Sequence, residues 1–232
     1  MIKTKAIVLS KKDINDYDGL ICFYTLDFGK INLIAKGIKR PSSKLIGHLD
    51  VFNLVDLMII KGKERDYVGS VISENSFLNI KSDYRRTLLA GQGLRFLRDL
   101  TFSNQPDFNI FLNLKDFLLN LDFSSDNSEA LVLFFKLKIL ENLGYDLDFA
   151  KCSECDSVDS LYFNFFDKEF LCQKCILKKG IYSNNLIKIS QTVLNLKKDI
   201  LSSELIELKK FTLEDIHQKE LETFISIIKK II

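Results

Sequence analysis

Four cysteines in one short segment constrain this chain more than any other feature of its sequence. They form two Cys-x-x-Cys pairs, Cys152 with Cys155 and Cys172 with Cys175, and sixteen residues separate the pairs. This is the spacing of a four-thiolate zinc site, because a two-residue spacer lets both sulfurs of a tight turn face one point. We therefore predict one structural Zn²⁺ ion with no open coordination position. Two disulfides or an iron–sulfur cluster are the alternatives.

The residues between the two pairs predict how the pairs meet. Leu161–Leu171 reads as two short apolar strands around a turn at Asp167 and Lys168. A hairpin of this kind would bring the second pair back to the first, as in a zinc ribbon, and we place this unit at residues 150–180. Between Cys152 and Cys175 the charged side chains are acidic on balance, which suits phosphate binding poorly.

The N-terminal segment bears on the compartment, and with it on the disulfide alternative. Met1–Ala6 lacks the apolar core of a secretion signal, and no stretch approaches the roughly eighteen apolar residues of a membrane span. Disulfides would need an oxidising compartment. A hydrophobic content of 47% with 28% charged residues is that of an ordinary globular protein. We expect a cytoplasmic protein.

The first 80 residues predict a small β-barrel. Short runs rich in Ile, Val, Leu and Phe alternate with turn residues. These runs are Lys5–Leu9, Leu20–Leu26, Lys30–Ala35, Val51–Ile60 and Val68–Phe77. Five short strands can close a barrel, and a five-stranded Greek-key barrel of the OB type is the simplest prediction. An SH3-like barrel is the main alternative.

From about residue 81 the hydrophobic pattern becomes helical. Helices are predicted over Tyr84–Phe102, Phe108–Leu121, Ser128–Leu143, Ser190–Leu201 and Thr212–Ile231. The third is apolar on most sides and should be the buried central helix, with Gly144 as its C-cap. Gly91 and Gly93 would each weaken the first helix by about 1 kcal/mol relative to Ala, unless something packs close to them.

These patterns together predict an α+β chain of two domains. An OB-fold barrel over residues 1–80 would be followed by a helical domain over residues 81–232. The zinc unit would be inserted between helices of this second domain.

Positive charge is concentrated in two predicted loops, although the formal net charge of the chain is only +2. Four cations and no acid lie in the first loop, which contains Lys36, Lys39, Arg40 and Lys44. A second basic turn contains Lys61, Lys63 and Arg65. Cationic loops on a small barrel can follow a phosphate backbone, and Tyr17, Phe28 and Tyr67 are candidates to stack bases. Solvated loops and a tyrosine or phenylalanine in the barrel core are the simpler alternatives.

No catalytic motif is visible in the sequence. Neither His48 nor His217 neighbours a candidate nucleophile, and phosphate-loop, dinucleotide and zinc-protease motifs are absent. Cys22 lies in an apolar run, where a thiol is most simply a small core residue. We therefore expect a binding protein and not an enzyme.

Three stretches resemble one known family. Phe23–Lys44 is similar to its strand, glycine turn and basic segment, which follows the pattern A-(K/R)-G-x-(R/K)-(R/K)-x-x-S-(R/K). Leu49–Leu57 resembles the strand that follows, and Glu141–Tyr145 resembles the L-G-Y ahead of the first cysteine pair. On these residues the chain resembles the RecO family of bacterial DNA repair proteins over essentially its whole length.

The resemblance implies a recombination mediator in DNA repair. Proteins of this family bind single- and double-stranded DNA, anneal complementary strands, and work with RecR and single-stranded-DNA-binding protein to help load RecA. It also implies DNA contacts by the cations of the first loop, weaker ones by those of the second, and zinc ligation by the four cysteines. Some members lack these cysteines, which favours a stabilising role for the metal. Such a protein would lie at the nucleoid.

We also expect the helical domain to bind a protein partner, namely the short apolar and acidic tail of single-stranded-DNA-binding protein. The candidates to bind its carboxylates are Arg85, Arg86, Arg95 and Arg98. A solvated helix face is the alternative reading of these arginines. Two other functions remain open, a zinc-ribbon adaptor that contacts only proteins and an accessory enzyme such as a nuclease or ligase.

Overall fold

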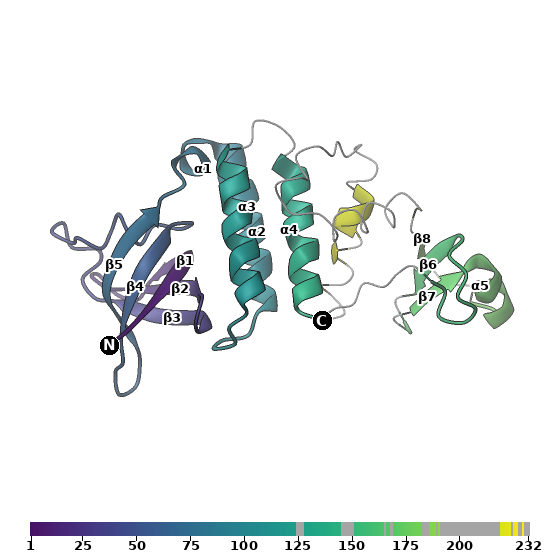
Figure 1. Cartoon of the computed structure of the whole chain (residues 1–232), viewed down its shortest axis with the longest axis horizontal. Coiled ribbons are helices and arrows are strands. Elements are labelled where there is room, and N and C mark those ends of the chain that lie inside the picture. Colours follow the sequence, from purple (N-terminus) through teal and green to yellow (C-terminus); the bar gives the residue numbers. More distant parts are fainter. Residues whose placement is uncertain are drawn as a thin grey trace. The chain divides into compact units, whose positions relative to one another are not determined.

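The structure is a computed structural model with two compact units, Met1–Phe135 and Lys136–Ile232, which we describe separately (Figure 1). It describes residues 1–123, 128–144, 151–164, 166–167, 169–181, 186–188, 190, 219–223, 225–226 and 229. Among these residues, no helix is long and apolar enough to cross a membrane.

Five strands at the start of the first unit close into a barrel. They are β1 (Ile2–Asp13), β2 (Gly19–Thr25), β3 (Gly29–Ala35), β4 (Leu54–Ile60) and β5 (Tyr67–Asn75). The order around the barrel is β1-β2-β3-β5-β4, and β1 pairs again with β4 to close it. Only β3 and β5 are parallel, at Ile34 and Tyr67. The predicted five-stranded barrel of the OB type is confirmed.

Alternating side chains of these strands fill the barrel. Phe23, Leu33 and Leu57 are almost fully buried in one cluster with residues from all five strands. Burying an aliphatic or phenyl side chain of this size stabilises a fold by about 1.5–3 kcal/mol, so these side chains stabilise the closed sheet. Cys22 is also buried, as predicted, and burial raises the pKa of its thiol.

Helices follow the barrel in the same unit. They are α1 (Leu78–Ser82), α2 (Tyr84–Leu100), α3 (Phe108–Phe123) and the first part of α4 (Ser128–Asn142). The side chain of Asp83 caps α2 by accepting a hydrogen bond from the Arg86 amide. Residues on all sides of α4 are buried, which confirms the predicted central helix. Gly144, at φ 77°, adopts the left-handed conformation expected of its C-cap.

The side chain of Lys30 joins the barrel to these helices. Its ammonium group donates to the Arg98 carbonyl at 2.6 Å and also to the Thr101 carbonyl, both at the C-terminal end of α2. Carbonyls there have no partner within the helix, and the helix dipole favours a cation beside them. The Lys30 carbonyl in turn accepts from the Asn104 amide at 3.0 Å. This barrel cation therefore serves the fold.

The second unit contains a small three-stranded sheet. β6 (Leu161–Asn164) pairs with β7 (Glu169–Cys172) as the predicted hairpin, and β8 (Leu186–Lys188) adds to the other edge of β6. A helix, α5 (Gln173–Lys179), follows β7 directly. Neither α5 nor β8 was predicted from the sequence.

Several predictions for this unit lie wholly or mostly outside the described residues. Ser190–Leu201 and His217 are among them, as is the arrangement of helices around the cysteine unit. Within Thr212–Ile231, the described residues are helical. The domain boundary near residue 80 stays a prediction.

The two glycines of α2 differ sharply in their surroundings. A Cβ on Gly93 would lie 2.6 Å from Cε1 of Phe117 and 3.3 Å from Cδ1 of Phe135. These two fully buried rings stack with their centroids 4.4 Å apart. No atom outside the helix backbone and the adjoining residues lies within 4 Å of the equivalent position on Gly91. Close packing thus explains Gly93 and leaves Gly91 unexplained.

This difference predicts opposite effects for two matched substitutions. Gly93→Ala should lower the free energy of unfolding by about 1–3 kcal/mol, because the stacked rings must move. Gly91→Ala should raise it by up to about 1 kcal/mol through helix propensity alone. Urea unfolding of both variants, followed by circular dichroism, measures the two values. Changes of the same sign in both variants would contradict the packing explanation.

Candidate functional site

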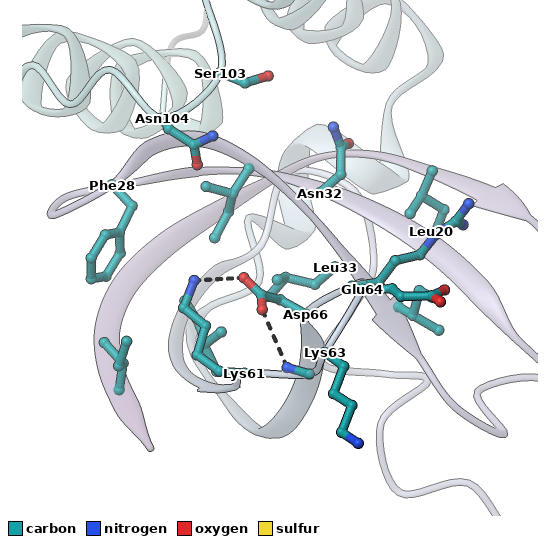
Figure 2. A pocket seen from close by; sticks show the side chains of 16 residues that line it. Leu20, Phe28, Asn32, Leu33, Lys61, Lys63, Glu64, Asp66, Ser103 and Asn104 are labelled. Atoms are coloured by element: carbon teal, nitrogen blue, oxygen red, sulfur yellow. Dashed lines mark hydrogen bonds and ion pairs between the residues drawn. The ribbon is translucent and has the colours of Figure 1, made fainter.

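A cavity of about 710 Å³ lies beside β3 in the first unit. Figure 2 shows the loop Lys61–Asp66, here the β4–β5 loop, on one side of it and Asn32, Ser103 and Asn104 on the opposite side. Leu20 of β2 and several residues of β3 also line it. In OB barrels the face of strands 2 and 3, with the loops between strands 1 and 2 and strands 4 and 5, is the usual ligand surface.

The β4–β5 loop is a tight turn that presents two cations. Lys61 is neutralised by Asp66, with Nζ 2.6 Å from the carboxylate (Figure 2). A Cβ on Gly62 would lie 2.1 Å from the Arg65 carbonyl oxygen, so the turn has no room for a side chain there. Lys63 and Arg65 are exposed and have no carboxylate partner among the described residues.

The segment Lys36–Lys44, here the basic loop, is held against the β1–β2 loop (Ile14–Asp18). The Gly37 amide donates to the Asp18 carboxylate at 2.7 Å, and the Lys39 amide donates to the Tyr17 carbonyl at 3.0 Å. Gly37 has φ 65° and begins a turn that closes when the Arg40 amide donates to its carbonyl. These contacts order the start of the basic loop.

The same contacts lower the pKa of the Asp18 carboxyl. The hydrogen bond from Gly37 lowers the pKa of this carboxyl, and a second one from the Asn15 side chain adds to the effect. The positive charges of Lys36 and Arg40 lower it further. Asp18 is therefore a charged anchor for the basic loop.

The four cations of the basic loop have different surroundings. Lys39 forms an ion pair with Asp13 at 3.0 Å. Lys36 lies over the ring of Tyr67, with Nζ 4.6 Å from its centroid, and Arg40 lies over Tyr17 at 5.3 Å. The fourth cation, Lys44, is exposed, with no partner among the described residues.

The three aromatic residues considered as base-stacking candidates also differ. Tyr17 is 56% exposed and Tyr67 is half-buried, and each has a cation over its ring. Phe28 is partly buried and packs against the barrel core, as the simpler alternative expected.

The four arginines of α2 do not form one cluster. Arg85 pairs with Glu129 through Nε at 2.8 Å, and Arg86 donates to the Asp122 carbonyl at 2.7 Å. Nine residues of helix turn Arg95 about 180° away from Arg86. Arg98 is half-buried, whereas Arg95 is exposed on the same helical face as the exposed side chain of Leu88.

The four cysteines of the second unit do come together. Their sulfur atoms all lie within 4.8 Å of one another, and the Sγ atoms of Cys155 and Cys172 are 3.6 Å apart. Cys152 and Cys155 lie in the turn before β6, Cys172 ends β7, and Cys175 lies in α5. All four are free thiols, and together they could hold a metal ion.

Backbone amides stabilise the thiolate form of Cys152. Burial raises the pKa of Cys152, but amide donors at Cys172, Glu154 and Cys155 outweigh it and lower the pKa to about 6. A hydrogen bond with the Cys155 side chain raises the pKa of the Cys175 thiol, and burial and repulsion by the charge on Cys152 add to the effect. A cation at the centre of the four sulfurs would remove this repulsion.

Lys179 is a structural residue of this unit that was not predicted from the sequence. Its ammonium group pairs with Glu154 at 2.7 Å and Glu169 at 3.0 Å, which ties α5 to the first cysteine pair and to β7. Lys179 lies one helical turn after Cys175. This spacing would have indicated that Lys179 lies near the cysteines only if the helix α5 had been predicted.

The anchors of the basic loop were missed as well. The sequence did not indicate that Asp13 and Asp18 contact the basic loop. The signal is the pairing of Gly19 with Ala35, which places the residues before β2 beside the residues after β3. That register cannot be read from composition.

Comparison with known proteins gives matches over nearly the whole chain. The family model described as Recombination protein O N terminal matches residues 1–77, and the one described as Recombination protein O C terminal matches residues 81–228. Together the two matches leave out only short segments between and after them.

Individual relatives agree with the family models. The DNA repair protein RecO of Thermodesulfovibrio yellowstonii is 30% identical over 225 residues, covering 96% of this chain and 89% of that protein. The protein of the same name from Alkaliphilus metalliredigens is 27% identical over 212 residues, covering 90% and 85%. That from Acetivibrio thermocellus is 29% identical over 177 residues, covering 75% and 70%.

Proposed function

Because the chain belongs to the RecO family of DNA repair and recombination proteins, we propose that it is a mediator that binds DNA through its barrel and anneals complementary strands. The observation that carries this proposal is the position of two cationic loops on an OB barrel. The β4–β5 loop lines the cavity, and the basic loop is held against the β1–β2 loop, which belongs to the usual ligand surface. In this proposal the protein binds strands and breaks no covalent bond.

The proposed mechanism assigns different weights to the loop cations. Lys36, Arg40, Lys44, Lys63 and Arg65 neutralise phosphates, and the release of counterions supplies most of the affinity. Lys39 and Lys61 contribute less, because Asp13 and Asp66 already neutralise them. Strands held by their phosphates keep their base edges free, so two bound strands can pair. This mode of binding gives little sequence preference.

The proposal extends to the partners that family membership suggests, namely RecR, single-stranded-DNA-binding protein and, indirectly, RecA. On α2 the outer face with Arg95 and Leu88 suits an apolar, acidic tail, because a guanidinium can bind a carboxylate beside an apolar contact. Arg85 and Arg86 are less suitable, since each is already engaged within the chain. The expected location is the cytoplasm, at the nucleoid.

We further propose that the four cysteines hold one structural Zn²⁺ ion. Zinc–sulfur bonds of about 2.3 Å in a tetrahedron place sulfurs roughly 3.8 Å apart. Sulfurs that all lie within 4.8 Å of one another need only small shifts to reach this geometry. The ion would link the first cysteine turn, β7 and α5, which the ion pairs of Lys179 also join.

The first prediction concerns the salt dependence of DNA binding. Replacing Lys36 and Arg40 by Ala should weaken binding to a single-stranded oligonucleotide and flatten the plot of log affinity against log salt. The slope should fall by roughly 0.7 for each phosphate that the variant no longer neutralises. Fluorescence anisotropy titrations at salt concentrations between about 50 and 200 mM provide the measurement.

The matched control for this prediction removes the same charge elsewhere. Lys3 and Lys174 are exposed and lie outside both loops, so their double replacement by Ala should leave the slope unchanged. An unchanged slope in the loop variant would remove the basic loop from the mechanism. Failure of the unaltered chain to bind DNA at low salt would favour the adaptor function instead.

Strand annealing tests the proposed activity and its partner together. The chain should accelerate the pairing of complementary strands coated with single-stranded-DNA-binding protein. Arg95→Ala should reduce this acceleration on coated strands by several-fold and leave annealing of naked strands unchanged, whereas Arg85→Ala should affect neither. A reduction on naked strands as well would contradict a role for Arg95 in binding the tail. Turnover that depends on a divalent metal would indicate an accessory enzyme.

The metal prediction uses the fifth cysteine as its control. The purified chain should contain one zinc ion per molecule, Cys152→Ser should lose it, and Cys22→Ala should retain it. Structural zinc contributes about 10–16 kcal/mol to the folding of small peptides, so its removal should expose the cysteine unit to proteolysis. Elemental analysis and limited proteolysis measure both effects. Iron with sulfide in place of zinc would overturn the assignment.

A further inference from the structure

Two tyrosine rings on the barrel surface each contact a cation of the basic loop. The Cζ atom of Arg40 lies 5.3 Å from the ring centroid of Tyr17, and Nζ of Lys36 lies 4.6 Å from that of Tyr67. Both distances fall within the roughly 6 Å over which an aromatic ring attracts a cation. Since Tyr17 is 56% exposed, burial in the core does not explain its place.

Tyr17 holds the basic loop at two points. Its carbonyl accepts a hydrogen bond from the Lys39 amide at 3.0 Å, and its ring lies under Arg40. The adjacent Asp18 fixes Gly37 at 2.7 Å. The backbone hydrogen bond therefore fixes the position of the Tyr17 ring, and the ring in turn contacts the Arg40 guanidinium group.

Tyr67 contacts both basic segments of the barrel. Lys36 lies over its ring, and a Cβ on Gly62 of the β4–β5 loop would lie 2.8 Å from its Cε2 atom. The backbone of Tyr67 pairs with Ile34 where β5 lies beside β3 in the barrel. The closed sheet thus fixes the ring between the two loops.

We propose that Tyr17 and Tyr67 are positioning residues, which hold Arg40 and Lys36 in place for a phosphate backbone and do not serve as stacking platforms for bases. This inference rests on the proposed DNA binding. A free Arg or Lys side chain loses rotamer freedom when it grips a phosphate. A ring beneath the cation restricts that freedom beforehand, so binding costs less entropy.

Binding to DNA with and without bases separates positioning from stacking. The full chain is titrated with a single-stranded oligonucleotide and with an abasic strand of equal length. Tyr17→Ala and Tyr67→Ala should each weaken binding to both strands by about two- to fivefold, the value of an exposed cation–π contact. Tyr17→Phe and Tyr67→Phe keep the ring and should bind like the unaltered chain. The control Tyr84→Ala changes a tyrosine on α2 that is 84% exposed and should have no effect.

Double variants test whether each ring acts through its cation. If it does, adding Tyr17→Ala to Arg40→Ala should weaken binding no further, and likewise for Tyr67→Ala with Lys36→Ala. Thermal melting checks the fold of every variant. Should Tyr67→Ala melt early, Tyr67→Leu keeps much of the apolar contact without the ring and should show the same decrease in affinity.

The outcomes distinguish this inference from the function on which it rests. Weaker binding confined to the strand with bases, or additive effects in the double variants, would show stacking and overturn the inference. If the cation variants weaken binding and the tyrosine variants do not, the inference fails while DNA binding by the loop stands. If the unaltered chain binds neither strand, the proposed function itself fails.

Discussion

The contact between Lys30 and the C-terminal end of α2 fixes the strand on which the candidate site is built. This strand, β3, supplies Leu33 to the barrel core and continues directly into the basic loop. Its start is held by two helix carbonyls, and its end lies opposite Gly19, where Asp18 anchors the loop. Because β3 is restrained at both ends, it fixes the position at which the basic loop begins.

Counting charges along the sequence overstates how many cations can bind a phosphate. Lys30 is engaged with backbone carbonyls, and Lys81 donates to Asn53 at 2.5 Å beside Asp50. Burial lowers the pKa of Lys81. Ion pairs neutralise two further lysines of the predicted site, so the surface depends on fewer cations than the sequence suggested. How those remaining cations are positioned then matters more than their number.

Much of the architecture followed from the sequence because single-segment patterns determine it. Short runs rich in Ile, Val, Leu and Phe identified all five barrel strands, and the cysteine spacing identified the four sulfurs that come together. Elements that depend on distant residues were missed. The five-residue α1 is one example, since Asp122 of α3 accepts from the Ile80 amide and completes its first turn. Such a helix has no periodicity to read.

The cations of the cysteine unit and those of the barrel have different kinds of partner. In the cysteine unit, Glu154 and Glu169 share Lys179, so two carboxylates neutralise this cation. On the barrel, Arg40 and Lys36 contact the rings of Tyr17 and Tyr67, and these contacts leave their charge uncancelled. An aromatic partner keeps a cation available to an anion, whereas a carboxylate does not, and this difference supports the proposal that the barrel binds DNA.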